Sequence, residues 1–93
     1  MSGTTRSSAG LDVRRRRLLF HAWHRGTREL DLLLGRFADA AIADLTDDEL
    51  EAFEALLHVP DPELYGWIAG RTPVPDNWDG MLLRRIISFH QPS

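Results

Sequence analysis

Apolar side chains recur at helical spacing along most of this 93-residue chain, and no segment of useful length alternates apolar and polar residues. The clearest stripe lies in the middle of the chain and consists of Leu30, Leu33, Leu34, Phe37, Ala38 and Ala41. Gly35 interrupts this stripe and costs a helix roughly 1 kcal/mol relative to alanine. We therefore expect a neighbouring segment to pack closely against Gly35. An earlier run, from Leu11 to Trp23, predicts a first helix that Gly26 closes in a left-handed conformation.

Three further helices are predicted from signals at their ends. Thr46 and Glu49 have the spacing of a capping box, so a third helix begins there and ends before Pro60. Its inward-facing residues are Leu50, Phe53, Leu56 and Leu57. Asp61 is predicted to cap a fourth helix, which Gly70 closes.

A proline-containing loop is predicted between the fourth helix and the last one. Pro73 and Pro75 exclude a helix there, and Asp76 or Asn77 is expected to cap the helix that follows. The stripe of that last helix consists of Leu82, Ile86 and Phe89. The pattern therefore predicts an all-α, compact five-helix domain.

Length and composition fit one such domain. A 93-residue chain has room for one modest core, and its 43% hydrophobic content is that of a globular protein. We expect residues 1–10 to be a disordered tail and residues 11–93 to form the domain. There is no cysteine, which favours a reducing compartment, and no apolar run approaches the roughly 20 residues that span a membrane. We expect a monomeric cytoplasmic bacterial protein that does not insert into a membrane.

Charge is distributed unevenly along the chain, although the net charge is only −3. Residues 1–36 carry eight arginines against three acids, a balance of +5, whereas residues 37–79 carry one arginine against eleven acids, a balance of −10. Such asymmetry can steer a partner of complementary charge. Ordinary solvated helix faces of opposite sign would also explain it.

No candidate catalytic or metal site stands out. The chain lacks a nucleophile elbow and a glycine-rich phosphate cradle. His21 and His24 are three residues apart, but no third ligand is placed by spacing to complete a zinc site. The block Arg14–Arg17 is basic enough for phosphate contacts, yet the acidic middle of so small a domain would repel a nucleic acid. We therefore expect a protein-binding function and no enzymatic activity.

Polar residues are dense between the first two predicted helices, in the segment Arg25–Asp31. A structural interpretation is available, in which Gly26 closes one helix, Thr27 caps the next and Glu29 favours its positive end. It does not explain the two arginines or Asp31. Glu29 is expected at the flank of the buried stripe, where Arg25 can approach it.

Four ordered segments make the sequence resemble a known family, the succinate dehydrogenase assembly factors that promote flavinylation. The resemblance runs from about Arg14 to His90. Its segments are Arg25-Gly26-x-x-Glu29 followed by Leu30-Asp31, then Leu45 to Leu50, Asp61 to Trp67, and Leu82 to Ile86. The first segment alone is a weak pattern, and the ordered set is specific.

The resemblance implies a function that composition does not reveal. Members of that family bind the flavoprotein subunit of succinate dehydrogenase, and sometimes of fumarate reductase, and assist covalent attachment of FAD to a histidine of that client. The implied partner-binding residues are Arg25, Gly26, Glu29 and, as a weaker match, Asp31. The factor would hold no cofactor stably and would act on the client's FAD. His24 stands where other members often have a basic residue.

One alternative belongs to another functional class. A small helical regulatory protein, antitoxin-like or associated with nucleic acid, would use the basic first helix. On that hypothesis the arginines of Arg14–Arg17 would matter more than Gly26 and Glu29.

Overall fold

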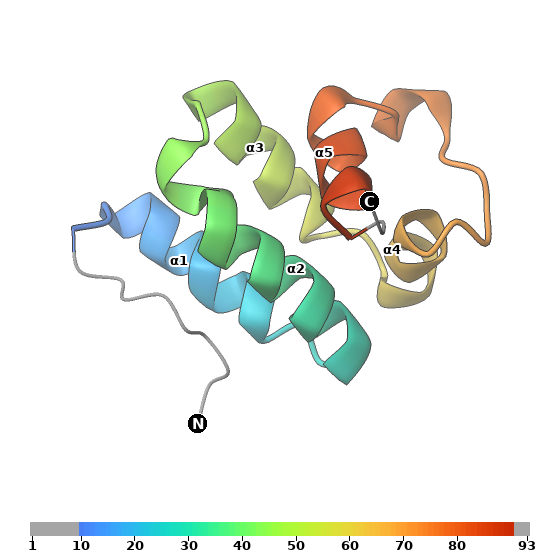
Figure 1. Cartoon of the computed structure of the whole chain (residues 1–93), viewed down its shortest axis with the longest axis horizontal. Helices are drawn as coiled ribbons and strands as arrows, with labels where there is room; N and C mark the ends of the chain where they lie inside the picture. The colour runs from blue at the N-terminus through green and yellow to red at the C-terminus, as the bar shows by residue number, and fades with distance from the viewer. Residues whose placement is uncertain (1–9, 91–93) are drawn as a thin grey trace.

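The computed structural model of the chain describes residues 10–90, and the predicted tail lies outside them except for Gly10 (Figure 1). Every regular element of the described part is helical, which confirms the predicted all-α domain of five α-helices. The α-helices are α1 (Val13–Trp23), α2 (Arg28–Ala41), α3 (Asp47–Leu56), α4 (Asp61–Ile68) and α5 (Met81–His90). Two short 3-10 turns, Ile42–Asp44 and Asp76–Trp78, complete the fold. No helix within residues 10–90 is long and apolar enough to cross a membrane.

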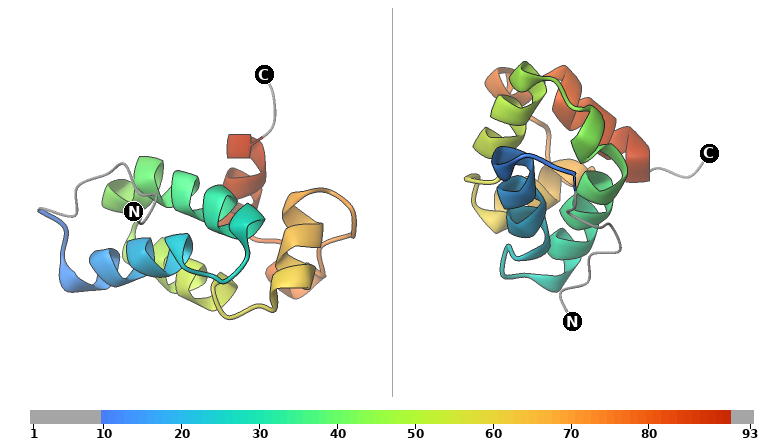
Figure 2. Two further views of the ribbon diagram at one scale, coloured as in Figure 1. Left: turned by 90° about the horizontal axis from the view of Figure 1, so that it is seen from below. Right: turned by 90° about the vertical axis from the view of Figure 1, so that its left-hand side faces the viewer.

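Helix α2 lies at the centre of the arrangement. It runs antiparallel to α1 as a packed hairpin and also contacts α4 and α5, while α3 bridges α1 and α5 (Figures 1 and 2). The apolar stripe of α2 explains this position, because Leu30, Leu34 and Phe37 are at most 2% exposed. The start of α2 therefore lies beside the start of α4, although 33 residues separate Arg28 from Asp61.

A tight contact between α1 and α2 confirms the expectation for Gly35. A Cβ built on Gly35 would lie 2.2 Å from Cδ2 of the Trp23 ring, so only a glycine lets the indole lie flat against α2. The indole Nε1 donates a 3.2 Å hydrogen bond to Oδ1 of Asp39, one turn further along the same helix. Gly35 lowers the helix propensity of α2, but its missing side chain leaves room for the buried Trp23 ring.

The capping box of α3 forms as predicted. The Thr46 hydroxyl accepts from the Glu49 amide at 3.2 Å, and the Glu49 carboxylate accepts from the Thr46 amide at 2.9 Å. The Thr46 amide, together with a guanidinium hydrogen bond from Arg85, holds the pKa of Glu49 below its usual range. The Glu49 carboxylate therefore caps the beginning of α3 and also links α3 to α5 through Arg85.

Two predicted caps are wrong. Pro60 occupies the N-cap position of α4, and the Asp61 carboxylate pairs with Arg25 instead of bonding to its own helix. Asp76 and Asn77 do not cap α5, because their backbone forms the 3-10 turn Asp76–Trp78, in which the Pro75 carbonyl accepts from the Trp78 amide at 2.9 Å. Helix α5 begins only at Met81.

Candidate partner-binding site

The backbone of the loop between α1 and α2 is held by the end of α1 and by a hydrogen bond to α2. Helix α1 ends at Trp23, and the Arg25 amide donates a 2.6 Å hydrogen bond to Oδ1 of Asp31, one turn inside α2. Gly26 has a φ of 115°, a conformation that other residues rarely adopt. A Cβ at Gly26 would meet no atom of residues 10–90 within 4 Å. Glycine is therefore required here by backbone conformation, while the space around it is open.

The Arg25 side chain points into the protein, where only 11% of it is exposed. Its Nη2 donates to the Val59 carbonyl oxygen at 2.6 Å and to Oδ1 of Asp61 at 2.5 Å. Among the described residues, its buried Nε has no hydrogen-bond partner. The guanidinium thus ties the α1–α2 loop to the α3–α4 turn, whereas the sequence placed it beside Glu29.

Glu29 lies in the first turn of α2 with its side chain exposed. Within residues 10–90 its carboxylate has neither a hydrogen bond nor an ion pair. Thr27 occupies the N-cap position as predicted, but its hydroxyl makes no capping bond and is also exposed. The start of α2 therefore presents an acceptor and a hydroxyl group to a partner.

A shallow pocket of about 350 Å³ lies where the starts of α2 and α4 meet. Its lining residues are Thr27, Glu29, Asp61, Pro62 and Tyr65. The Tyr65 ring is covered by the Arg71 guanidinium, 5.5 Å from the ring centroid. The sequence singled out Asp61 to Trp67 as a segment of the resemblance, yet gave Asp61 only a helix-capping role. Its place beside Glu29 depends on a contact between helices that no local pattern reveals.

The four residues predicted to bind a partner fall into two groups. Arg25 and Asp31 make internal bonds that fix the loop. Gly26 and Glu29 lie on its exposed side. Within residues 10–90, Gly26 and Glu29 are exposed, whereas Arg25 and Asp31 are partly buried.

His24 and the arginines Arg14 and Arg15, which the sequence analysis also considered, make contacts within the protein. The His24 ring stacks on Phe20 with centroids 3.9 Å apart, and its Nδ1 lies 2.7 Å from the Phe20 carbonyl oxygen. The part of the chain that the structure describes holds no group of three or more potential metal ligands. In the basic block, Arg14 pairs with Glu54, and Arg15 bonds to Asp12 and to two carbonyl groups. Only half of the block Arg14–Arg17 is left exposed.

Comparison with known families decides between the two functional hypotheses. The profile of a family described as "Flavinator of succinate dehydrogenase" matches residues 16–90, which is most of the chain. The chain belongs to this family. The match confirms the resemblance seen in the four segments and favours the assembly-factor hypothesis over the regulatory one.

Relatives of this chain are found in bacteria and in mitochondria. A FAD assembly factor SdhE of Acetobacter pasteurianus is 47% identical over 77 residues, covering 83% of this chain and 71% of the relative. A mitochondrial succinate dehydrogenase assembly factor 2 of Debaryomyces hansenii is 34% identical over 85 residues, covering 88% of this chain and 60% of the relative. Its counterpart in Dictyostelium discoideum is 38% identical over 72 residues, covering 77% of this chain and 51% of the relative. The matched region is thus little more than half of these two mitochondrial factors.

Membership sets the class of function. The flavinators are assembly factors and not enzymes, and they associate with the flavoprotein subunit of succinate dehydrogenase and act on its FAD. The prediction of a non-enzymatic assembly factor is confirmed at this level.

Proposed function

We propose that this flavinator binds the flavoprotein subunit of succinate dehydrogenase and promotes covalent attachment of FAD to it through the exposed side of the α1–α2 loop. The observation that carries the proposal is Glu29, an exposed carboxylate that lies at the rim of a pocket and has no hydrogen bond or ion pair with any described residue. A second client, the flavoprotein subunit of fumarate reductase, would bind the same surface. The factor works as a monomer in the bacterial cytoplasm, without a cofactor of its own and without nucleic acid.

The chemistry of the bond belongs to the client and its FAD, and the factor contributes positioning. Holding two reacting groups in attack geometry lowers a barrier by several kcal/mol. A factor that binds the reactive client conformation more tightly than the others raises its population by that difference in affinity. The residues of this chain need only recognise that conformation.

Each residue of the loop has a distinct part in that recognition. Glu29 accepts charge-assisted hydrogen bonds from client donors, which are about twice as strong as neutral ones. Gly26 lets the client approach the backbone, since no described residue comes within 4 Å of the position where a Cβ would stand. Arg25 and Asp31 are positioning residues, because their internal bonds hold the loop in shape before the client arrives.

We expect this chain to restore client flavinylation in a bacterial host that lacks its own factor. Covalent flavin on the client is measured by in-gel fluorescence after denaturation, with the empty vector as negative control. The Arg16→Ala variant should restore fluorescence as well as the wild type, because Arg16 is an exposed residue of α1 away from the loop. Failure of the folded wild-type chain to restore fluorescence would contradict the proposal. A defect confined to Arg16→Ala would favour the basic-helix hypothesis instead.

A further inference from the structure

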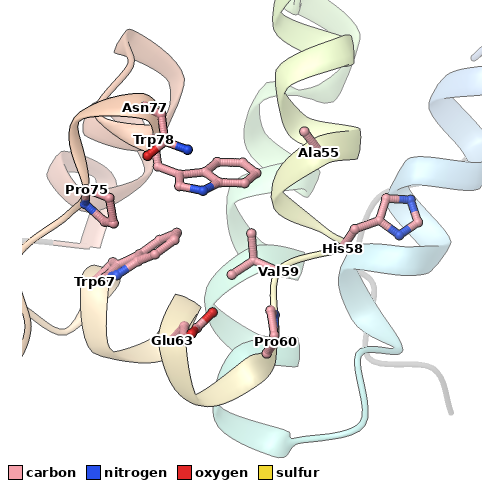
Figure 3. Close-up of a pocket in the computed structure, with 9 residues that line it drawn as sticks. All are labelled: Ala55, His58, Val59, Pro60, Glu63, Trp67, Pro75, Asn77 and Trp78. Carbon is pink, nitrogen blue, oxygen red and sulfur yellow. The ribbon is translucent and has the colours of Figure 1, made fainter.

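A second pocket, of about 450 Å³, opens between the α3–α4 turn, α4 and the loop that leads to α5 (Figure 3). Two tryptophans form one side of it. The ring centroids of Trp67 and Trp78 are 5.9 Å apart and their planes are inclined by 37°. Trp67 is mostly buried and Trp78 half-buried, so each ring is held in place by the fold while part of it borders the pocket. We call this site the tryptophan pocket.

The tryptophan pocket has the electrostatics of a cation site. Glu63 directs its carboxylate into the space beside Trp67, whereas the His58 ring points away from it towards α1 (Figure 3). In the described part of the chain, Glu63 has no ion pair or hydrogen bond, and no arginine lines the pocket. The pocket also lies within the segment 37–79, whose charge balance is −10.

We propose that the tryptophan pocket binds an arginine side chain of the client flavoprotein. A guanidinium group is planar, stacks on aromatic faces and is less strongly hydrated than an ammonium group. Attraction to an aromatic ring acts within about 6 Å of the ring centroid, and here two rings and a carboxylate border one space. The long apolar stem of arginine fits walls made of Pro60 and Pro75. Arginine is also among the residues enriched at the energetic centres of interfaces.

The position of the pocket points to the client as the protein that carries this arginine. The chain has two sides where the α3–α4 turn enters α4: the Val59 carbonyl and Asp61 bind Arg25, while Val59 and Pro60 line the tryptophan pocket. Asp61 also lines the shallow pocket beside Glu29. A client that covers Glu29 and extends past the turn therefore reaches the tryptophan pocket. This identification of the partner rests on the proposed function, but the ligand class does not.

The ligand class is tested on the whole chain by NMR, using the three indole N–H signals. The probe is N-acetyl-arginine N-methylamide, and the matched control is the citrulline analogue, which has nearly the same shape without the charge. The arginine probe should shift the signals of Trp67 and Trp78 in a saturable way. The signal of Trp23 should stay in place, because its indole is bonded to Asp39 between α1 and α2. Equal shifts with citrulline, or no shift of Trp67 and Trp78, would overturn the proposal and leave the proposed function intact.

The role of the carboxylate and of the client is tested with Glu63→Gln, and Glu51→Gln on the exposed side of α3 is the matched control. Both variants should fold, because both side chains are exposed. Glu63→Gln should lower the affinity for the arginine probe and for the purified client flavoprotein by at least about fivefold each. Glu51→Gln should change neither affinity beyond error. Unchanged client affinity with Glu63→Gln would overturn the assignment of the arginine to the client. Weaker client binding with an unchanged probe titration would overturn the cation site.

Discussion

Replacing Gly35 with alanine is expected to destabilise the protein by about 1–3 kcal/mol, the range for overpacking a core. In an exposed helix the same change would stabilise by roughly 1 kcal/mol. The sign is reversed here because the added methyl group would lie 2.2 to 2.6 Å from three atoms of the Trp23 ring. Urea denaturation measures the difference in the free energy of unfolding.

A double-mutant cycle tests whether the Trp23 ring causes the destabilisation by Gly35→Ala. In a Trp23→Leu background, Gly35→Ala should cost less than about 1 kcal/mol, because the ring that it would strike is gone. Gly80→Ala is the control, since a Cβ there would meet no atom of the described residues within 4 Å. If the cost of Gly35→Ala were the same with and without Trp23, the close packing of α1 on α2 would be contradicted.

Replacing Arg25 with alanine is expected to cost about 2–4 kcal/mol of unfolding free energy. The change would leave the Val59 carbonyl and the Asp61 carboxylate without their shared donor at a site where both are largely buried. The loss is placed below that of a fully buried pair because 24% of the Asp61 side chain is exposed. Arg28→Ala, at an exposed position of the same segment, should change stability by less than about 0.5 kcal/mol.

This prediction separates two roles for Arg25. A destabilised Arg25→Ala variant would lose flavinylation because less of the protein is folded and because its α1–α2 loop is no longer held in shape. If Arg25→Ala melted like the wild type and still lost client binding, Arg25 would be a direct contact, and its internal position in the structure would be contradicted.

The helices were predictable because their signals are local. The stripe Leu30 to Ala41 fixes which face of α2 is buried, and the Thr46–Glu49 spacing satisfies the first amides of α3 without help from elsewhere. The close neighbour of Gly35 was also predictable, since a glycine within a strong stripe implies a contact. The sequence did not say that this neighbour would be Trp23.

The wrong cap at Asp61 shares a cause with the missed part of the site. Asp61 is a good local N-cap, but Arg25, 36 residues earlier, offers it a charged partner at 2.5 Å. Local rules do not include such a competitor. The same long-range pairing turns Arg25 inward and brings α4 beside Glu29. The sequence therefore indicated a candidate segment but not which of its side chains face outward.

The family resemblance and the physical analysis contributed different parts of the account. The resemblance indicated the segment from Arg25 to Asp31, which periodicity explains only in part. The structure then divides that segment into residues that hold the loop and residues that are available to a client. The central claim is that Glu29 belongs to the second group.

That claim is tested most directly by the rate of covalent flavin attachment with purified components. The client subunit, prepared without covalent flavin, is incubated with FAD and with wild-type factor, Glu29→Ala or the control Glu51→Ala, and in-gel fluorescence is followed over time. Glu29→Ala should unfold like the wild type, because an exposed carboxylate contributes within about 1 kcal/mol. It should nevertheless slow flavin attachment at least about tenfold at limiting factor, the loss typical of one interface anchor, while Glu51→Ala does not. A folded Glu29→Ala factor that supports the wild-type rate would contradict the account.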